Sequence, residues 1–301
     1  MTGLGALIRR NTKLYFRDRG MFFTSLITPL ILLVLYGTFL SNVYEETFRG
    51  ALEAAGAAAS DRLIGGCVGG ELASSLLAVS CVTVAFCSNL LMVQDKITGA
   101  RQDLTIAPIR PGTLALGYYL STLLSTLLIC LVATAACLGY LLHAGWFLTA
   151  KDVAALLLDV ALLVLFGTAL SSCVNFFLST NGQASAVGTI ISAGYGFVCG
   201  AYMPISQFSK GLQRVISFLP GTYGTSLLRN HALRGVFEEM IAQGFPGEVV
   251  EAIRDSVDCN LYFFGSRVEP GQMYFVLAAS IAIAIGLYVA MNILRGWKRR
   301  G

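Results

Sequence analysis

Charged side chains are scarce in this chain of 301 residues, since only 13% of them are Asp, Glu, Lys or Arg and 55% are hydrophobic. Soluble domains carry about 25% charged residues. The mean hydropathy of +0.70 points the same way. The composition therefore excludes an ordinary soluble domain, and it favours a function in transport over chemistry in solution.

Motifs for catalysis and metal binding are also missing. No Gly-Lys dipeptide occurs, so the chain cannot form the phosphate-binding loop of P-loop nucleotide hydrolases. The two histidines, His143 and His231, stand in no HExxH pattern and in no convincing triad context. The eight cysteines form no CxxC pair and no zinc spacing. We therefore expect no catalytic residue, metal site, disulfide framework or bound cofactor, and the energy for any uphill transport should come from an ion gradient or a partner.

Long apolar runs, in contrast, are abundant. Six of them reach the roughly 20 residues that a helix needs to cross a bilayer, and only a helix satisfies its own backbone hydrogen bonds there. The predicted fold class is an all-α integral membrane protein with six transmembrane helices. The first run is too long for a signal peptide and lacks a cleavage site. The predicted spans are 20–41, 63–92, 114–142, 153–178, 184–203 and 272–294.

Basic residues mark one side of the membrane. The segment 1–19, the loop 93–113 and the tail after residue 294 hold twelve Lys and Arg but three acidic residues. The positive-inside rule then places both termini in the cytoplasm and predicts a multi-pass protein of the cytoplasmic (inner) membrane. The basic residues are thus explained as topology determinants, and no nucleic-acid partner is expected.

We divide the chain into an amphipathic interfacial (connecting) helix at 1–19 and a transmembrane domain at 20–301. A solvated basic tail is the alternative for the first segment. The apolar face that favours the interfacial helix consists of Leu4, Leu7, Ile8, Leu14 and Tyr15.

Two loops have features of their own. The cytoplasmic loop 94–113 alternates charged and apolar residues at the spacing of a short amphipathic helix, which would suit docking of a soluble partner, although a solvated loop is equally compatible. The segment 199–234 has short apolar runs broken by proline and glycine, which predict an external re-entrant hairpin. The polar residues 235–270 then predict a small, partly helical external cap. The predicted external part of the transmembrane domain, with the re-entrant helices and the polar cap, is residues 204–270.

Two carboxylates, Glu71 and Asp159, lie inside predicted spans. An intramembrane carboxylate suggests a functional site, but both lie close enough to the outer surface to reach headgroups or water, and the two interpretations stay open. No charge lies near the midplane, which argues against an ATP-independent secondary carrier. A membrane-embedded enzyme would need His, Asp or Glu clustered near one interface, and the sequence shows no such set.

The two loops carry a resemblance. The chain resembles the membrane subunit of type-2 ATP-binding-cassette (ABC) transporters, in the permease family of drug and polysaccharide exporters. It departs from the inner motif of that family with Ile97 in place of a second acid and Ala100 in place of threonine. The inner motif is matched by Asp95, Lys96, Gly99, Leu104, Pro108 and Arg110, and the outer one by Gly200, Pro204, Leu212, Gln213, Leu219, Pro220, Tyr223 and Arg229.

The resemblance implies a mechanism. Such permeases pair as homo- or heterodimers with a second copy or paralogue. Each contacts a cytoplasmic ABC ATPase subunit, which holds the ATP and Mg²⁺, through the N-terminal helix and the loop after span two. Closure of the ATPase dimer would push on that loop, and spans two and five would part or close around the substrate. We expect the push to be transmitted by Gly99, Arg101, Leu104 and Pro108.

The small and polar faces of spans two and five suit an amphiphilic or lipid-like cargo, although ordinary helix packing by small residues explains each position as well. We favour a hydrophobic drug or antimicrobial compound over a glycan or lipid-linked polymer, since no external aromatic row stands out in the sequence. The residues predicted along this route are Ser75, Thr83, Ser88, Ser185, Thr189 and Tyr195.

Overall fold

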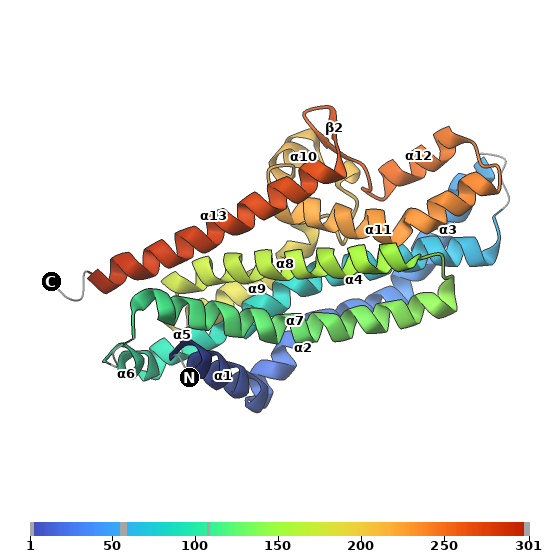
Figure 1. Cartoon of the computed structure of the whole chain (residues 1–301). Coiled ribbons are helices and arrows are strands. Elements are labelled where there is room, and N and C mark those ends of the chain that lie inside the picture. The colour runs from blue at the N-terminus through green and yellow to red at the C-terminus, as the bar shows by residue number, and fades with distance from the viewer. Residues whose placement is uncertain (1–2, 55–58, 107–108, 298–301) are drawn as a thin grey trace.

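The computed structural model describes residues 3–54, 59–106 and 109–297. In these residues the protein is a bundle of long helices with short elements at its two ends (Figure 1). The long helices are α2 (Arg19–Leu35), α4 (Asp61–Ser88), α7 (Pro111–Ala144), α8 (Ala150–Phe177), α9 (Asn181–Val198), α11 (Pro220–Ala242) and α13 (Pro270–Trp297). The shorter elements are α1 (Gly3–Arg17), η1 (Tyr36–Leu40), α3 (Ser41–Ala54), α5 (Leu90–Ile97), α6 (Ala100–Ile106), η2 (Ile205–Gln207), α10 (Lys210–Ile216), α12 (Gly247–Ser256), β1 (Leu261–Phe263) and β2 (Ser266–Val268).

Local sequence signals set several of the helix boundaries. The Asp18 side chain accepts a hydrogen bond from the Met21 amide at 3.1 Å, which ends α1 and caps α2. Thr149 and Asp152 form a capping box at the start of α8. Pro111 and Pro220 occupy the first turns of α7 and α11, where a missing amide proton costs no hydrogen bond.

Helix α4 lies at the centre of the bundle. It packs against α2, α3, α7, α8, α9 and α11, and it is buried along almost its whole length. A helix surrounded in this way needs no polar face, which explains why its residues after Arg62 are apolar or small on all sides, with Glu71 as the exception. Helices α2, α7 and α13 have outward faces that expose large apolar side chains, as helices in contact with lipid do.

Close packing at this centre depends on glycine. A Cβ atom on Gly235 of α11 would collide with the backbone carbonyl oxygen of Phe147. We predict that Gly235→Ala lowers the free energy of unfolding by about 1–3 kcal/mol, the usual cost of overpacking. Gly139→Ala on α7 is the matched control, because nothing lies within 4 Å of the added methyl group. Thermal unfolding of the purified variants, followed by tryptophan fluorescence, measures both; equal midpoints would contradict the prediction.

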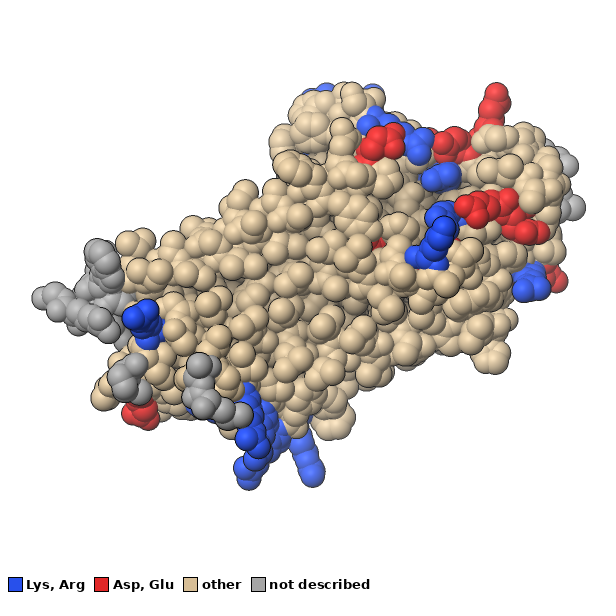
Figure 2. All heavy atoms as spheres, viewed as in Figure 1, with Lys and Arg blue, Asp and Glu red and all other residues tan. Residues whose placement is uncertain are grey.

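The charge distribution fits a membrane protein. Figure 2 shows Lys, Arg, Asp and Glu gathered at the two ends of the visible face, with an almost uncharged band between them. Among the described residues, five helical segments are long and apolar enough to cross a membrane. They are Arg19–Gly50, Asp61–Ile97, Pro111–Ala144, Ala150–Phe177 and Pro270–Leu294. The chain is thus an all-α, multi-pass membrane protein. Helix α9, predicted as the fifth span, is not among the five, so the count of six stays a prediction.

Residues 204–270, which are predicted to be external and are called the outer segment below, form longer helices than the sequence pattern predicts. After the short α10, helix α11 runs unbroken through residues 234 and 235, where the sequence pattern predicts the change from hairpin to polar cap. It packs against α4, α8 and α13. The polar region that follows contains α12 and an antiparallel β-hairpin in which Leu261 pairs with Val268. It is therefore partly helical, and whether the hairpin before it is re-entrant stays a prediction.

Candidate functional site

Asp95 of α5 joins three helices at the end of the bundle that holds α1 and α6. Its carboxylate accepts two hydrogen bonds from Arg10 of α1, at 2.7 and 3.1 Å, and one from the Tyr118 hydroxyl of α7, at 2.6 Å. The Asp95 side chain is buried, whereas Arg10 is partly exposed. Bidentate bonds between guanidinium and carboxylate are strong and directional. We call this arrangement the Asp95 joint; it fixes α1 and α7 relative to α5.

Lys96, the next residue, ties α5 to α8. Its Nζ donates to the carbonyl oxygens of Asn175, Phe176 and Leu178 at 2.7–2.8 Å. These carbonyls end α8, where no further helical turn satisfies them and where the helix dipole favours a cation. Lys96 therefore satisfies the end of α8 while holding α5 against it.

The rest of the inner motif surrounds helix α6. Gly99 links α5 and α6 with a φ of +83°, a left-handed conformation that glycine adopts without strain. Arg101 donates to the Asn292 side chain of α13 at 3.1 Å, and Leu104 packs on a buried cluster that includes Leu7 of α1. Arg110 is exposed and precedes α7. Pro108 lies outside the described residues. The predicted single amphipathic helix is thus two short helices that meet at Gly99.

A buried ionic cluster lies at the other end of α4. Arg229 of α11 is 1% exposed and forms ion pairs with Glu71 at 2.7 Å and with Asp258 at 3.2 Å. The same guanidinium donates to the Ser75 hydroxyl at 3.2 Å and to the Gly200 carbonyl oxygen at 2.7 Å. Burial raises the pKa of Asp258 above its ordinary value, against the opposing effect of Arg229. We call these three charged residues the Arg229 cluster.

The Arg229 cluster holds the outer segment against the bundle. Asp258 lies just before the β-hairpin and also accepts the backbone amide of Ile205, at 2.8 Å. Glu71 belongs to the central helix α4. The role of Glu71, left open by the sequence, is therefore to pair with a buried arginine inside the protein, not to reach lipid headgroups.

The other residues of the outer motif shape the surroundings of this cluster. Gly200 has a φ of +76°, and Pro204 precedes the short η2 turn. Gln213 donates to the Ser206 and Phe208 carbonyl oxygens, at 3.1 and 2.8 Å. These residues have structural roles.

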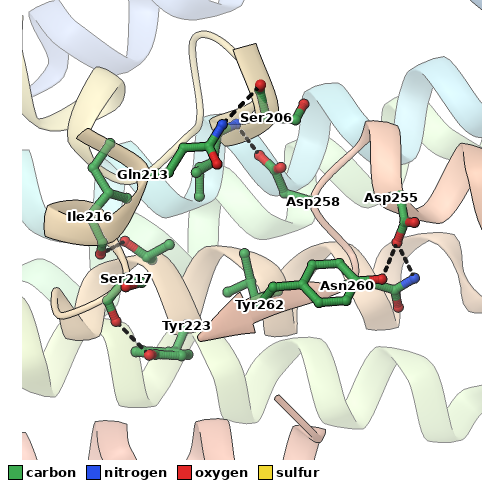
Figure 3. A pocket seen from close by; sticks show the side chains of 12 residues that line it. Ser206, Gln213, Ile216, Ser217, Tyr223, Asp255, Asp258, Asn260 and Tyr262 are labelled. Carbon is green, nitrogen blue, oxygen red and sulfur yellow. Dashed lines mark hydrogen bonds between the residues drawn. The ribbon is translucent and has the colours of Figure 1, made fainter. Parts of the chain in front are cut away.

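A small cavity of about 180 Å³ lies beneath this segment, lined in part by Gln213, Tyr223 and Asp258 (Figure 3). The Tyr223 hydroxyl donates to the Ser217 carbonyl oxygen at 2.5 Å on one side of it. Leu219 and Pro220 begin α11 on the same side, and Leu212 is 43% exposed on α10.

A second polar cluster links α8, α11 and α13. Asp159 Oδ2 lies 2.6 Å from His231 Nδ1, and the other carboxylate oxygen accepts from the Tyr274 hydroxyl at 2.7 Å. Asp159 is fully buried. The partners of His231 could not be predicted from the sequence, because Asp159 is 72 positions away and Tyr274 belongs to a different predicted span. The side chains of Asp159, His231 and Tyr274 thus join α8, α11 and α13.

The predicted route residues fall into two groups. Ser185 and Thr189 of α9 are exposed and line a hollow of about 740 Å³ between α2, α9 and the α4–α5 segment. Ser75, Thr83 and Ser88 of α4 are instead buried inside the bundle. Tyr195 is also buried. The structure thus brings two of the six residues to one hollow, and the complete route stays a prediction.

The lining of this hollow is amphiphilic. Helix α2 contributes Thr24 and Thr28 beside Ile27 and Ile31, and α5 contributes Leu90 and Gln94. Hydroxyl and amide groups spaced among branched apolar side chains can contact both parts of an amphiphile.

No metal centre is visible in the described part of the chain, where no three His, Cys, Asp or Glu side chains converge. Each of the eight cysteines lies in that part and is a free thiol. The polar groups described above form hydrogen bonds and ion pairs with one another.

Comparison with known proteins identifies the family of this chain. No curated protein matches the chain. The sequence model of the family described as ABC-2 type transporter matches residues 2–232, which covers more than half of the chain. The match extends from α1 through the inner motif to Arg229 and ends within α11, before Asp258, α12 and the β-hairpin. The chain therefore belongs to the ABC-2 type transporter family, as a multi-pass membrane permease.

Proposed function

We propose that this permease is the membrane subunit of an ATP-driven exporter that moves an amphiphilic or hydrophobic compound, such as a drug or antimicrobial, out across the cytoplasmic membrane. A cytoplasmic ABC ATPase subunit supplies the energy, and this chain binds no nucleotide of its own. The export direction follows from the exporters that its two motifs resemble. A glycan or lipid-linked polymer is the alternative cargo, and an ATP-independent carrier is the less favoured mechanism.

One observation carries the proposal: the short helix α5 both lines the hollow and binds the helices at the predicted cytoplasmic end of the bundle. Its Leu90 and Gln94 line the hollow, whereas Asp95 and Lys96 bind α1 and α8. A displacement of α6 is passed through Gly99 to α5 and so to the wall of the hollow. This direct connection is what an exporter driven from the cytoplasm requires.

The exposed surface of α6 suits the ATPase partner. Gln102, Asp103 and Thr105 are exposed, and Ile106 is 83% exposed beside them. Partly buried Leu104 anchors the opposite side of the helix. A short helix with a fixed inner face and a mixed outer face is a suitable docking element for a soluble subunit.

A second permease copy or paralogue completes the hollow in this proposal. Helix α9 has little bulk, and several of its residues are exposed, among them Ser185, Thr189 and Ile190, which is 67% exposed. The Thr189 hydroxyl is satisfied within the helix, by the Ser185 carbonyl oxygen at 3.0 Å, and faces of small and hydroxyl-bearing residues favour packing against another helix. Coverage by a second protomer would shield them and would enclose the cargo between two α9 helices.

The test reverses the character of the residues that hold α6. Arg101→Glu disrupts the bond to Asn292, and Leu104→Asp places a charge against an apolar cluster. We expect each variant, assembled with its ATPase subunit in vesicles, to keep ATP hydrolysis within about twofold and to lose cargo transport about tenfold, equivalent to about 1.4 kcal/mol. Gln243→Glu is the control, because it adds a charge at an exposed position after α11, outside the proposed docking surface. Unchanged transport and hydrolysis in both variants would remove the proposal.

A further inference from the structure

An exposed aromatic cluster lies on the outer segment. Phe218, between α10 and α11, and Phe264, at the tip of the β-hairpin, are 61% and 63% exposed, and Phe263 is 37% exposed. Their ring centroids are 4.9–6.0 Å apart. The sequence showed no external aromatic row because the members come from segments some 45 residues apart. Three large apolar rings on one outer surface indicate a contact partner.

The hairpin turn holds its ring outward against a backbone preference. Phe264 has a φ of +49°, and Gly265 follows with a φ of +88°. Two such residues form the tight turn that normally favours asparagine followed by glycine, because a bulky residue is strained there. An exposed phenylalanine at this position is a poor choice for a hairpin surrounded only by water.

Two cations flank the aromatic rings. Lys210 and Arg214 lie one turn apart on α10 and are both exposed, and the seven residues of α10 include no acid. The Arg214 guanidinium lies 5.9 Å from the centre of the Phe264 ring. Arg267 on β2 is already paired with Glu251 at 2.9 Å. Figure 2 shows Lys and Arg at the crest formed by α10 and the hairpin.

A hollow of about 810 Å³ opens beside the rings. It is lined by Phe218, Phe263, Phe264, Phe275 and Val276, among other residues. Phe275 belongs to the membrane-crossing helix α13 and is 75% exposed. It lies five residues after Pro270, which at 1.5 Å per residue is about 7.5 Å into the span. Amphipathic segments insert to roughly 5–10 Å, at the boundary between headgroups and acyl chains. Phe263 and Phe264, which share this hollow with Phe275, would then lie at the same boundary.

We propose that this surface seats an anionic phospholipid of the outer leaflet. The phosphate binds Lys210 and Arg214, and an acyl chain lies in the hollow along Phe264 and Phe275. Adjacent cations and exposed aromatic rings favour an anionic lipid interface. The inference rests on the proposed topology, in which residues 204–270 are external. The hairpin with Phe263 and Phe264 lies beyond residue 232, outside the family match, whereas Lys210, Arg214 and Phe218 lie within it.

The experiment measures the depth and the lipid preference of the tip in the full-length chain. Phe264→Trp is made in a background in which Trp146 and Trp297 are replaced by Phe, and the protein is placed in vesicles of mixed phosphatidylcholine and phosphatidylglycerol. Either lipid carries bromine on its acyl chains, which quenches a nearby indole. We expect brominated phosphatidylglycerol to quench at least about twofold more than brominated phosphatidylcholine at equal content. Lys210→Glu with Arg214→Glu should abolish that preference.

Two further positions serve as controls. Ile283→Trp, 70% exposed on the same span and outside this hollow, should be quenched equally by both lipids, and Gln243→Trp, exposed after α11, should be quenched by neither. Phe263→Trp replaces the first variant if that one does not fold. Quenching at 264 no stronger than at 243 would overturn the proposal, as would equal quenching by the two lipids; shielding of the tip by a second copy or by cargo gives the first of these results. The quenching experiment needs no ATPase subunit. If the indole is quenched as expected but the protein does not transport cargo together with its ATPase, only the proposed function is refuted.

Discussion

Replacing Arg229 with methionine should lower the free energy of unfolding by about 3–5 kcal/mol, the usual cost of breaking a buried ion pair. The substitution leaves the Glu71 and Asp258 carboxylates inside the protein without their cation. It also removes donors to the Gly200 carbonyl oxygen and the Ser75 hydroxyl. The outer segment would then lose its main polar attachment to α4. Thermal unfolding in detergent, with the yield of folded protein, measures the effect.

Neutralising the partners tests the cause. Adding Glu71→Gln and Asp258→Asn to Arg229→Met should recover part of the lost stability, because buried charge costs more than a neutral amide of similar shape. Asparagine also suits the left-handed φ of +52° at position 258. Arg49→Ala, which breaks exposed ion pairs with Glu45 and Asp61, is the control and should have little effect. A triple variant no more stable than Arg229→Met would show that the charges are not responsible.

The second large effect concerns the Asp95 joint. Asp95→Ala should reduce ATP-driven transport ten- to a hundredfold while the ATPase subunit still binds. The change leaves the Arg10 guanidinium and the Tyr118 hydroxyl without their acceptor. Hydrogen bonds to charged groups contribute about 1.5–3 kcal/mol each, and about 1.4 kcal/mol corresponds to a factor of ten. Transport per ATP hydrolysed, measured in vesicles, is the readout.

Graded variants separate this role from simple unfolding. Tyr118→Phe removes one of the three hydrogen bonds to Asp95 and should give an intermediate loss. Asp61→Ala removes a carboxylate whose side chain is 90% exposed, so it should leave transport unchanged. If Asp95→Ala transports as well as the unaltered chain, the joint does not carry the coupling.

Local sequence features predicted much of the fold. Apolar runs and the distribution of Lys and Arg predicted a helical membrane protein, because bilayer thickness and the positive-inside rule act on short stretches of chain. The inner and outer motifs predicted the family, which the match over residues 2–232 confirms. Helix α9, with its glycines and hydroxyl groups, shows the limit of this reasoning: its composition suits contact with another chain as well as a span.

The polar connections could not be predicted in the same way. Glu71 and Arg229 are 158 positions apart, and Asp159 and His231 are 72 apart, so no periodicity relates them. An arginine within the outer motif and two carboxylates inside apolar runs were the available signals, since a buried charge requires a partner. The sequence could not show which charges would pair. The aromatic surface of the hairpin was missed for the same reason.

The most direct measurement compares cargo transport by vesicles that contain this chain alone with transport by vesicles that also contain its ATPase subunit. In our account the chain alone moves cargo no faster than empty vesicles, and ATP drives accumulation only when both subunits are present. Full-speed accumulation by vesicles that hold this chain and no ATPase would contradict the account.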